Sequence, residues 1–433
     1  MQSISTLPRI APAPSALSAD VQAWTPILAA YCVYLGIALL GYVFKQDLLS
    51  VGGLLFVLII AIRYGHTLRH LPVTPLSIAV LLVAVLPLIP ISMNSAEMNQ
   101  EGWGYLVKHE AFYLIILISV QLRLPPLTRC PQRVWAYIAL LAVLILSPLI
   151  ARLTGRAIAG ERISGLFANP NNLALAALCL CCLIDDTSNR SVRWFTHLLV
   201  LLLIVLSGTA GAMEGYLLGR FYQVCQVQRS SRRVLLMLLT IVGVILMVIT
   251  FRQTLRTNHA TKFVTEKIDI AVENIPLILA GRQINYGPIE ERNGEGMASG
   301  LWRLEHWRRT ILLYRAGTPM QQLFGYGIGT SDLLLGKKPH NDYLRMLLEM
   351  GLIGALAVAV VWGLLVRRMA PASRWVFVMF AVYALTENNA DNFVAVTLLA
   401  LFVTSVTMSA EHRRGVVQPV APGMIPSPNE VMR

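Results

Sequence analysis

Runs of about twenty apolar residues recur along the chain, and they constrain its fold more than any other feature. A bilayer core about 30 Å thick needs roughly 20 mostly apolar helical residues per crossing. Twelve runs approach this requirement, at about 24–44, 47–62, 74–93, 103–120, 134–151, 168–184, 194–208, 210–225, 233–251, 346–366, 374–389 and 392–410. Only 14% of the residues are charged, against about 25% in soluble domains. We therefore expect an all-α, polytopic bundle of about twelve transmembrane helices, surrounded by membrane lipids.

The basic residues between these runs predict the orientation of the chain. Alternate loops carry clustered arginines: Arg63 and Arg69; Arg123, Arg129 and Arg133; Arg190 and Arg193; Arg229, Arg232 and Arg233; Arg367, Arg368 and Arg374. The loops 94–102 and 390–391 contain no Lys or Arg. The positive-inside bias then places both ends in the cytoplasm, with 1–23 and 411–433 as disordered tails. The net charge of +13 reflects this orientation. Without a zinc or RNA-binding signature, it does not indicate a nucleic-acid partner.

Two outward segments depart from the bias. Segment 152–167 carries Arg152, Arg156 and Arg162, which suggests contact with an anion, although Arg152 could instead snorkel from a helix end. Segment 252–345 is the one long loop, with 13 Lys/Arg and 9 Asp/Glu. It separates the first nine spans, 24–251, from the last three, 346–410. Amphipathic helices are expected within it over 262–280 and 299–316, joined by a mobile loop at 281–298.

The strongest local candidate for chemistry is the stretch Lys337-Lys338-Pro339-His340-Asn341-Asp342, which leads into the tenth run. It places an imidazole and two lysines at the predicted outer start of a helix. Free backbone N–H groups there, together with these cations, suit a phosphate ligand. The alternative is a solvated helix cap, formed by Asn341 or Asp342.

Four motifs in order on the predicted outer face resemble one family. They are Arg162-Ile-Ser-Gly165-Leu-Phe167-Ala-Asn169-Pro170-Asn171, Ser299-Gly300-Leu301-Trp302-Arg303, Gly325-Tyr326-Gly327-Ile328-Gly329, and His340-Asn341 followed by Leu344. Together they resemble the O-antigen ligase family, whose superfamily also holds O-antigen polymerases and protein O-oligosaccharyltransferases. The resemblance covers about 103–410.

This resemblance implies a glycosyltransferase at the periplasmic face of a Gram-negative inner membrane. The donor would be O-antigen polysaccharide on undecaprenyl pyrophosphate, and the acceptor a sugar hydroxyl of the lipid A core. His340 would be the general base. The residues implied to hold pyrophosphate or glycan are Arg162, Arg303, Asn171, Lys338 and Asn341. No cofactor or metal is expected, since no acidic metal-binding motif occurs on the outer face.

One position departs from the family pattern. Members commonly carry Ser-x-Thr-Arg-Gly-Ala where the eighth run begins, whereas this chain has Ser207-Gly208-Thr209-Ala210-Gly211-Ala212. Alanine thus stands at the arginine position. Either another cation, such as Arg162 or Lys338, takes its part, or Ala210 is a substitution that impairs turnover. The intact flanking residues favour the substitution.

Several alternatives stay open. Arg303 could form a surface salt bridge with Glu305 or Glu295, and Asn171 could cap a helix after Pro170. Direct attack by the acceptor would invert the anomeric carbon, whereas a retaining route would need a carboxylate such as Glu387 or Asp391.

Other functions make different predictions. Polymerases generally lack this His-Asn-x-x-Leu form. Protein O-oligosaccharyltransferases often carry a further outer domain near the C-terminus, whereas this sequence stops soon after the twelfth run. A transporter of lipid-linked glycan predicts an internal repeat and charges spread through the bundle.

Overall fold

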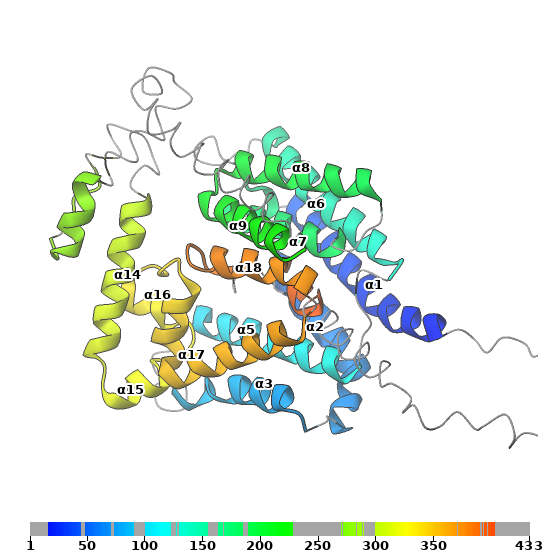
Figure 1. The fold of residues 1–433 in the computed structure, drawn as a ribbon, viewed down its shortest axis with the longest axis horizontal. Helices are drawn as coiled ribbons and strands as arrows, with labels where there is room; N and C mark the ends of the chain where they lie inside the picture. Colours follow the sequence, from blue (N-terminus) through cyan, green and yellow to red (C-terminus); the bar gives the residue numbers. More distant parts are fainter. Residues whose placement is uncertain are drawn as a thin grey trace, which may run out of the picture.

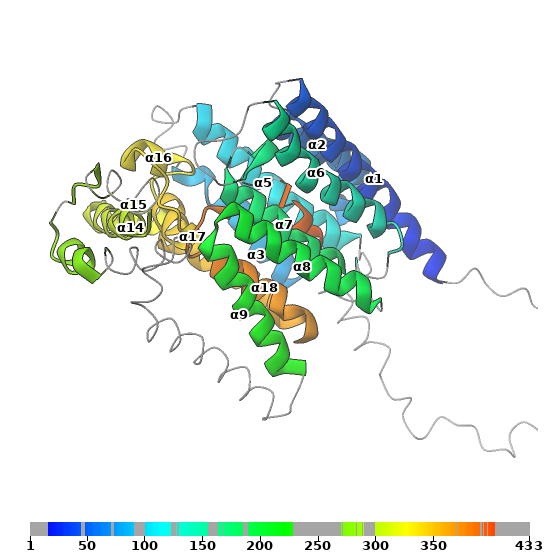
Figure 2. The same cartoon turned by 90° about the horizontal axis from the view of Figure 1, so that it is seen from above.

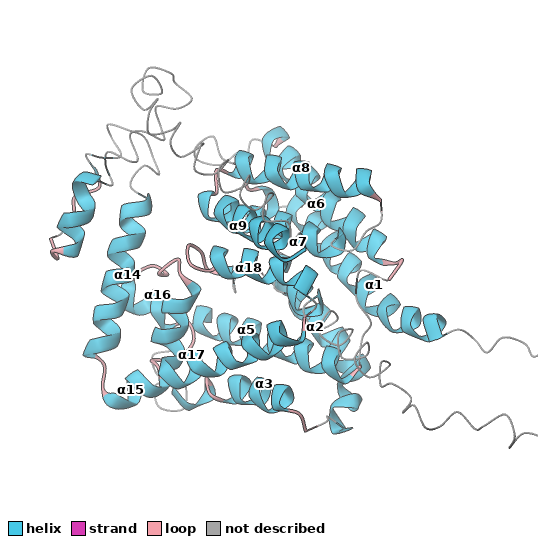
Figure 3. Cartoon of the chain, viewed as in Figure 1, coloured by secondary structure: helices cyan, strands magenta, loops and turns pink. Residues whose placement is uncertain are grey.

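The computed structural model describes residues 16–44, 48–70, 73–90, 100–122, 127, 130–154, 163–167, 169–184, 189–227, 270, 272–282, 284–287, 289, 299–369, 371–389, 392, 394–395 and 397–402. Within these ranges every regular element is a helix (Figures 1 and 3). The predicted all-α class is confirmed for this part of the chain.

Ten long helices coincide with predicted apolar runs. They are α1 (Ala16–Val43), α2 (Leu49–Tyr64), α3 (Pro75–Val85), α5 (Gln100–Gln121), α6 (Arg133–Leu153), α7 (Pro170–Ile184), α8 (Arg190–Ser207), α9 (Ala210–Val227), α17 (Asp342–Arg368) and α18 (Arg374–Tyr383). Short 3-10 turns join some of them, namely η1 (Gly65–His70), η4 (Gly165–Phe167) and η5 (Pro371–Ser373). The predicted run 233–251 lies outside the described residues. Of 392–410, the described helical pieces are 394–395 and 397–402.

Four of these helices, α1, α6, α8 and α17, are long and apolar enough to cross a membrane by length and composition. Helices α2, α3, α7 and α18 are apolar but shorter. The chain is therefore a multi-pass membrane protein. The count of twelve crossings stays a prediction.

Two predicted spans are less regular as helices than expected. Helix α3 ends at Val85, and turn residues 86–87 separate it from a further helical turn at 88–90, because Pro87 lacks the backbone N–H that a continuing helix needs. Helix α18 ends at Tyr383, and the polar residues that follow form turns up to about residue 389. This correction matters because the turn carries Glu387, which the prediction had included in the span.

The long helices lie side by side, and α14 (Ser299–Ala316) runs across their ends (Figures 1 and 2). Helix α7 is central, with nearly every side chain buried. Its cysteines, Cys179, Cys181 and Cys182, are fully buried free thiols that pack in the apolar core.

Helices α9 and α18 pack closely through a stripe of glycines. Gly211, Gly215 and Gly219 lie four residues apart on one face of α9. A Cβ at Gly215 would come within 2.6 Å of the Met379 carbonyl, and one at Gly219 within 2.8 Å of the Trp375 carbonyl. Small residues let two helix backbones approach in this way. The start of α9 is thereby held against the turn that follows α18.

The long predicted loop is partly helical, as expected. Helix α14 coincides with the predicted segment 299–316, and a helix over 272–279 falls within the predicted 262–280. Two short helices follow α14, namely α15 (Pro319–Phe324) and α16 (Thr330–Leu335).

The glycine-rich stretch after α15 packs against a kink in α17. At the kink, Gly351 has φ +66°, which favours glycine. The freed helix carbonyls find new donors, since the Tyr326 amide donates to the Leu348 oxygen (3.0 Å) and the Gly327 amide to the Glu349 oxygen (2.9 Å). The motif beginning at Gly325 is thus a structural brace for α17.

Candidate functional site

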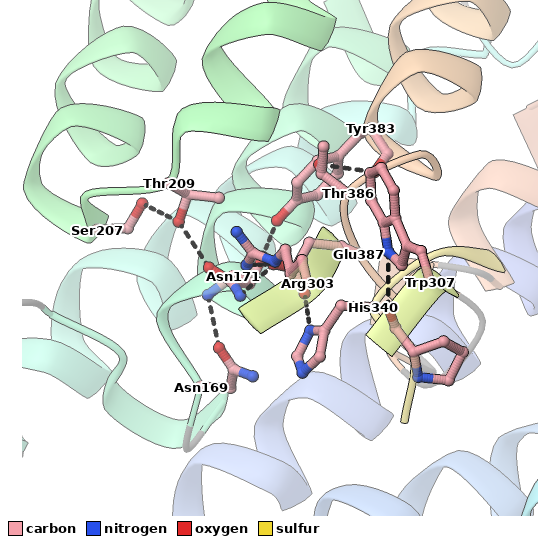
Figure 4. A network of polar contacts seen from close by, with 11 residues as sticks. Asn169, Asn171, Ser207, Thr209, Arg303, Trp307, His340, Tyr383, Thr386 and Glu387 are labelled. Carbon is pink, nitrogen blue, oxygen red and sulfur yellow. Dashed lines mark hydrogen bonds and ion pairs between the residues drawn. The ribbon is translucent and has the colours of Figure 1, made fainter. Parts of the chain in front are cut away.

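Polar side chains from five segments meet where α14 crosses the bundle ends. They come from the starts of α7, α9 and α17, from the turn after α18, and from α14 itself (Figure 4). These segments are far apart in sequence, so the site exists only in the folded chain.

Glu387 is the centre of this cluster. Its Oε2 lies 2.9 Å from His340 Nδ1. Its Oε1 accepts hydrogen bonds from Arg303 Nη2 and from Asn171 Nδ2, each at 2.5 Å. The residue is only 5% exposed, so the desolvated carboxylate is compensated by one cation and two further donors.

The backbone around His340 directs its ring toward this carboxylate. His340 has φ +48° and is the only non-glycine residue with positive φ in the described part of the chain. Such a left-handed conformation costs energy and is enriched at functional sites. Asn341 then begins α17 as its N-cap, accepting from the Leu344 amide at 3.0 Å. The capping alternative from the sequence is therefore confirmed for Asn341.

The start of α17 is tied directly to the turn that carries Glu387. The Asp342 amide donates to the Ala384 oxygen at 2.9 Å, and the Asn389 amide donates to Asp342 Oδ2 at 2.8 Å. These two bonds lie on either side of Glu387 in sequence. They hold the imidazole and the carboxylate in register without contacting either one.

Helix α14 supports the other side of His340. Trp307 Nε1 donates to the Pro339 carbonyl at 2.9 Å. The Trp302 ring meets the His340 ring edge-on, with centroids 5.3 Å apart. Arg303 lies between these two tryptophans in sequence, so one helix delivers both the cation on Glu387 and the apolar wall beside His340.

A chain of hydrogen bonds links the site to the start of α9. Ser207 Oγ donates to Thr209 Oγ1 (2.9 Å), which donates to Asn171 Oδ1 (3.1 Å). Asn169, not Asn171, caps α7, because its Oδ1 accepts from the Asn171 amide. Ala210 is exposed and directly follows Thr209, so the position lacking the family arginine adjoins the cluster.

His340 and Glu387 line a cavity of about 300 Å³. Its other lining residues are Asn169, Asn172, Asp332, Lys337, Lys338 and Asn388. The His340 side chain is 26% exposed, so part of the ring remains accessible from this space. Lys338 also lies over the Tyr105 ring, with Nζ 4.1 Å from the centroid. The cavity thus combines two lysines with amides and a carboxylate-bound imidazole.

The structure brings together most of the residues that the sequence singled out. His340, Arg303, Asn171 and Lys338 all lie in or beside this cavity. Arg162, Glu295 and Asp391 lie outside the described residues. Arg303 does not pair with Glu305, which instead binds Arg309 at 2.5 Å.

The sequence analysis named Glu387 only as a possible carboxylate for a retaining route and did not predict its central place in the site. Its cluster with three of the predicted residues could not be seen from any motif. One signal was available, since Glu387 is the only acidic residue in the predicted span 374–389, where a charge usually has a specific partner.

Comparison with known proteins supports the interpretation of these motifs. A search of curated protein sequences finds no match. A protein-family model described as O-antigen ligase matches residues 195–359. That region holds Arg303, the glycine-rich stretch and His340 in the expected order. The match over residues 195–359 therefore supports the resemblance to the O-antigen ligase family.

Proposed function

We propose that this protein is an O-antigen ligase that acts at the periplasmic face of the inner membrane. It would move a polysaccharide from undecaprenyl pyrophosphate to a sugar hydroxyl of the lipid A core. The observation that carries the proposal is the His340–Glu387 pair beside a cavity that two lysines line.

His340 acts as the general base. With Glu387 ionised, Nδ1–H donates to Oε2, which leaves the Nε2 lone pair for the acceptor hydroxyl. As that proton moves to Nε2, the carboxylate stabilises the imidazolium that forms and keeps the ring oriented. The sequence predicted the lysines near His340, whereas its hydrogen-bonding neighbour is a carboxylate.

Transfer proceeds by direct displacement. The acceptor oxygen forms a bond to the anomeric carbon while that carbon's bond to the pyrophosphate oxygen breaks. Undecaprenyl pyrophosphate leaves with the bonding electrons, and the acceptor proton remains on His340. This route inverts the anomeric centre. A nucleophilic role for Glu387 is disfavoured because the residue is only 5% exposed and is held by three side chains.

Cations at the cavity stabilise the leaving group. Lys337 and Lys338 line the cavity and suit the two phosphates as point charges. Arg303 is partly committed to Glu387, while its buried Nε has no hydrogen-bond partner among the described residues. An arginine at position 210 would add a charge next to Asn171, and Arg162 is a further candidate. Because Ala210 stands at the family arginine position, we expect weak turnover by this chain.

The test is transfer of lipid-linked glycan to purified lipopolysaccharide core by the wild-type chain and by Ala210→Arg. Ala210→Arg is expected to raise transfer, with no loss when a chelator is added. Adding His340→Ala should lower the rate by about 10²–10⁴-fold, the usual contribution of general-base catalysis.

His66→Ala is the matched control, since His66 is an exposed histidine that lines neither described cavity. Its transfer rate should equal that of its parent. A robust reaction that survives loss of His340 would contradict the general-base role. Transfer to a protein serine or threonine, or polymerisation of the donor, would assign the chain to another branch of the superfamily.

A further inference from the structure

A second cavity lies next to the first, behind Trp302. It has a volume of about 270 Å³ and is lined by Ile284, Tyr286, Trp302, Glu305, His306 and Arg309. The Trp302 ring stacks on His306, with centroids 4.2 Å apart, and meets His340 edge-on on the side of the first cavity. Trp302 therefore lines this cavity and contacts His340, which lines the first.

The polar groups of this cavity are organised around Glu305. Its Oε1 accepts from Arg309 Nη2 at 2.5 Å, and its Oε2 accepts from the Tyr286 hydroxyl. Burial, followed by the bond to Glu305, raises the pKa of Tyr286 above its ordinary value, so the phenol stays a donor. The Glu305–Arg309 pair carries no net charge, and no lysine lines the cavity.

His306 has an unused polar atom. The residue is 6% exposed, and its Nε2 has no hydrogen-bond partner among the described residues. Burial and the nearby Arg309 lower the pKa of His306 below its ordinary value, so the ring is neutral near pH 7. A buried polar atom without a partner costs free energy, which a ligand could recover.

Tyr286, Glu305 and His306 are not required to hold the preceding segment, residues 270–289, against α14. A small apolar core of Ile270, Ile278 and Leu301 already makes that contact. A buried carboxylate is a costly addition for the same purpose. Its retention beside an aromatic wall and an unpaired imidazole nitrogen is better explained by recognition of a polar ligand.

We propose that this second cavity is a subsite for a neutral, hydroxyl-bearing sugar ring of one of the two glycans joined in the reaction. The proposal rests on the transferase function above and assigns part of its glycan recognition to Tyr286, Glu305 and His306. Glu305 can accept further hydrogen bonds from sugar hydroxyls, and His306 Nε2 can accept one more. The volume is near the lower limit of roughly 300 Å³ for ligand pockets, which suits a single ring.

The position next to Trp302 gives the subsite a role in positioning. A sugar held there lies one aromatic ring away from His340. Binding a ring beside the reacting one would orient the hydroxyl or the anomeric carbon in the first cavity. The acceptor core and the donor glycan offer the same chemistry, so the experiment has an arm for each.

The test measures binding of two lipid-free probes to the full-length protein in detergent by saturation-transfer NMR. One probe is core oligosaccharide released from lipopolysaccharide by mild acid, and the other is an oligosaccharide of the donor glycan. Tyr286→Phe removes the hydroxyl and His306→Phe removes the ring nitrogens, while both substitutions keep an aromatic ring. We expect each substitution to raise the Kd for one of the probes by about threefold to tenfold, the usual effect of losing one hydrogen bond.

Tyr314→Phe is the matched control, because Tyr314 lies on the same helix and donates to the Gln322 carbonyl away from the cavity. It should bind both probes as the wild type does. Unchanged Kd values for both probes in Tyr286→Phe and His306→Phe, with wild-type thermal stability, would overturn the subsite.

The same assay separates this proposal from the transferase function. Binding needs no turnover, so the Kd shifts are expected whether or not the protein transfers glycan. In steady-state transfer, the subsite variants should raise KM for the same glycan whose binding they weaken. An Ala210→Arg protein that shows the Kd shifts but transfers no glycan would refute the transferase function and leave a saccharide site.

Discussion

Glu349 and Glu387 are both buried carboxylates paired with an arginine, but their partners lie at very different distances along the sequence. The partners of Glu349 are near it: Arg345, four residues earlier on α17, lies 3.1 Å away, and Ser331 Oγ donates at 2.5 Å. It lines neither of the two described cavities. This cluster braces the kinked start of α17 against α16.

The partners of Glu387 come from distant parts of the chain. Asn171, Arg303 and His340 are separated from it by 216, 84 and 47 residues. Glu387 itself lines a cavity and leaves its imidazole partner partly exposed there. The comparison teaches that a buried ion pair is not by itself a functional signal. What distinguishes Glu387 is that its partner still has a face open to a ligand.

The largest expected difference between the two carboxylates is catalytic. Glu387→Gln should lower transfer by about a hundredfold or more, because an amide cannot stabilise the imidazolium and can present the wrong hydrogen-bonding group to Nδ1. The measurement is the initial rate of glycan transfer in the Ala210→Arg background. In the His340→Ala background the same change should add almost nothing, since the two residues act as a unit. A further large loss there would give Glu387 an independent role, such as nucleophile.

For Glu349 the expected effect is on stability. Glu349→Ala should lower the free energy of unfolding by about 3–5 kcal/mol, because it leaves Arg345 buried without its carboxylate. The readout is the thermal denaturation midpoint in detergent, followed by tryptophan fluorescence. Replacing both partners, as Arg345→Met with Glu349→Leu, should recover much of the loss. If Glu349→Ala abolished transfer with an unchanged denaturation midpoint, Glu349 would have a functional role like that of Glu387.

The smallest expected effect on transfer concerns Thr209, which bonds to Asn171 and so reaches Glu387 only indirectly. Thr209→Val keeps the shape but removes the hydrogen bond to Asn171, so transfer should fall by about twofold to tenfold. Thr196→Val is the control, since Thr196 is a buried threonine that bonds to Tyr137 and lines neither described cavity. Equal losses of transfer in the two variants would mean that the effect is general destabilisation.

Much of the fold follows from local sequence. Apolar runs of sufficient length predicted the presence of ten of the helices, and helical periodicity predicted α14. These features depend on neighbours within a few positions, which is why a single sequence reveals them. The early end of α18 was missed, because the predicted span was extended through the polar residues Thr386, Glu387 and Asn388, which form a turn.

The sequence alone determined that this chain is a multi-pass helical protein with a cationic segment around His340. Its motifs also resembled the O-antigen ligase family, whose family model matches residues 195–359. Only the tertiary structure decided that Glu387 is the hub of the site, and that Trp302 of the second cavity contacts His340 of the first. The physical reason is that these roles depend on contacts between segments up to 216 residues apart. Helix packing sets such contacts, and neither spacing nor composition encodes them.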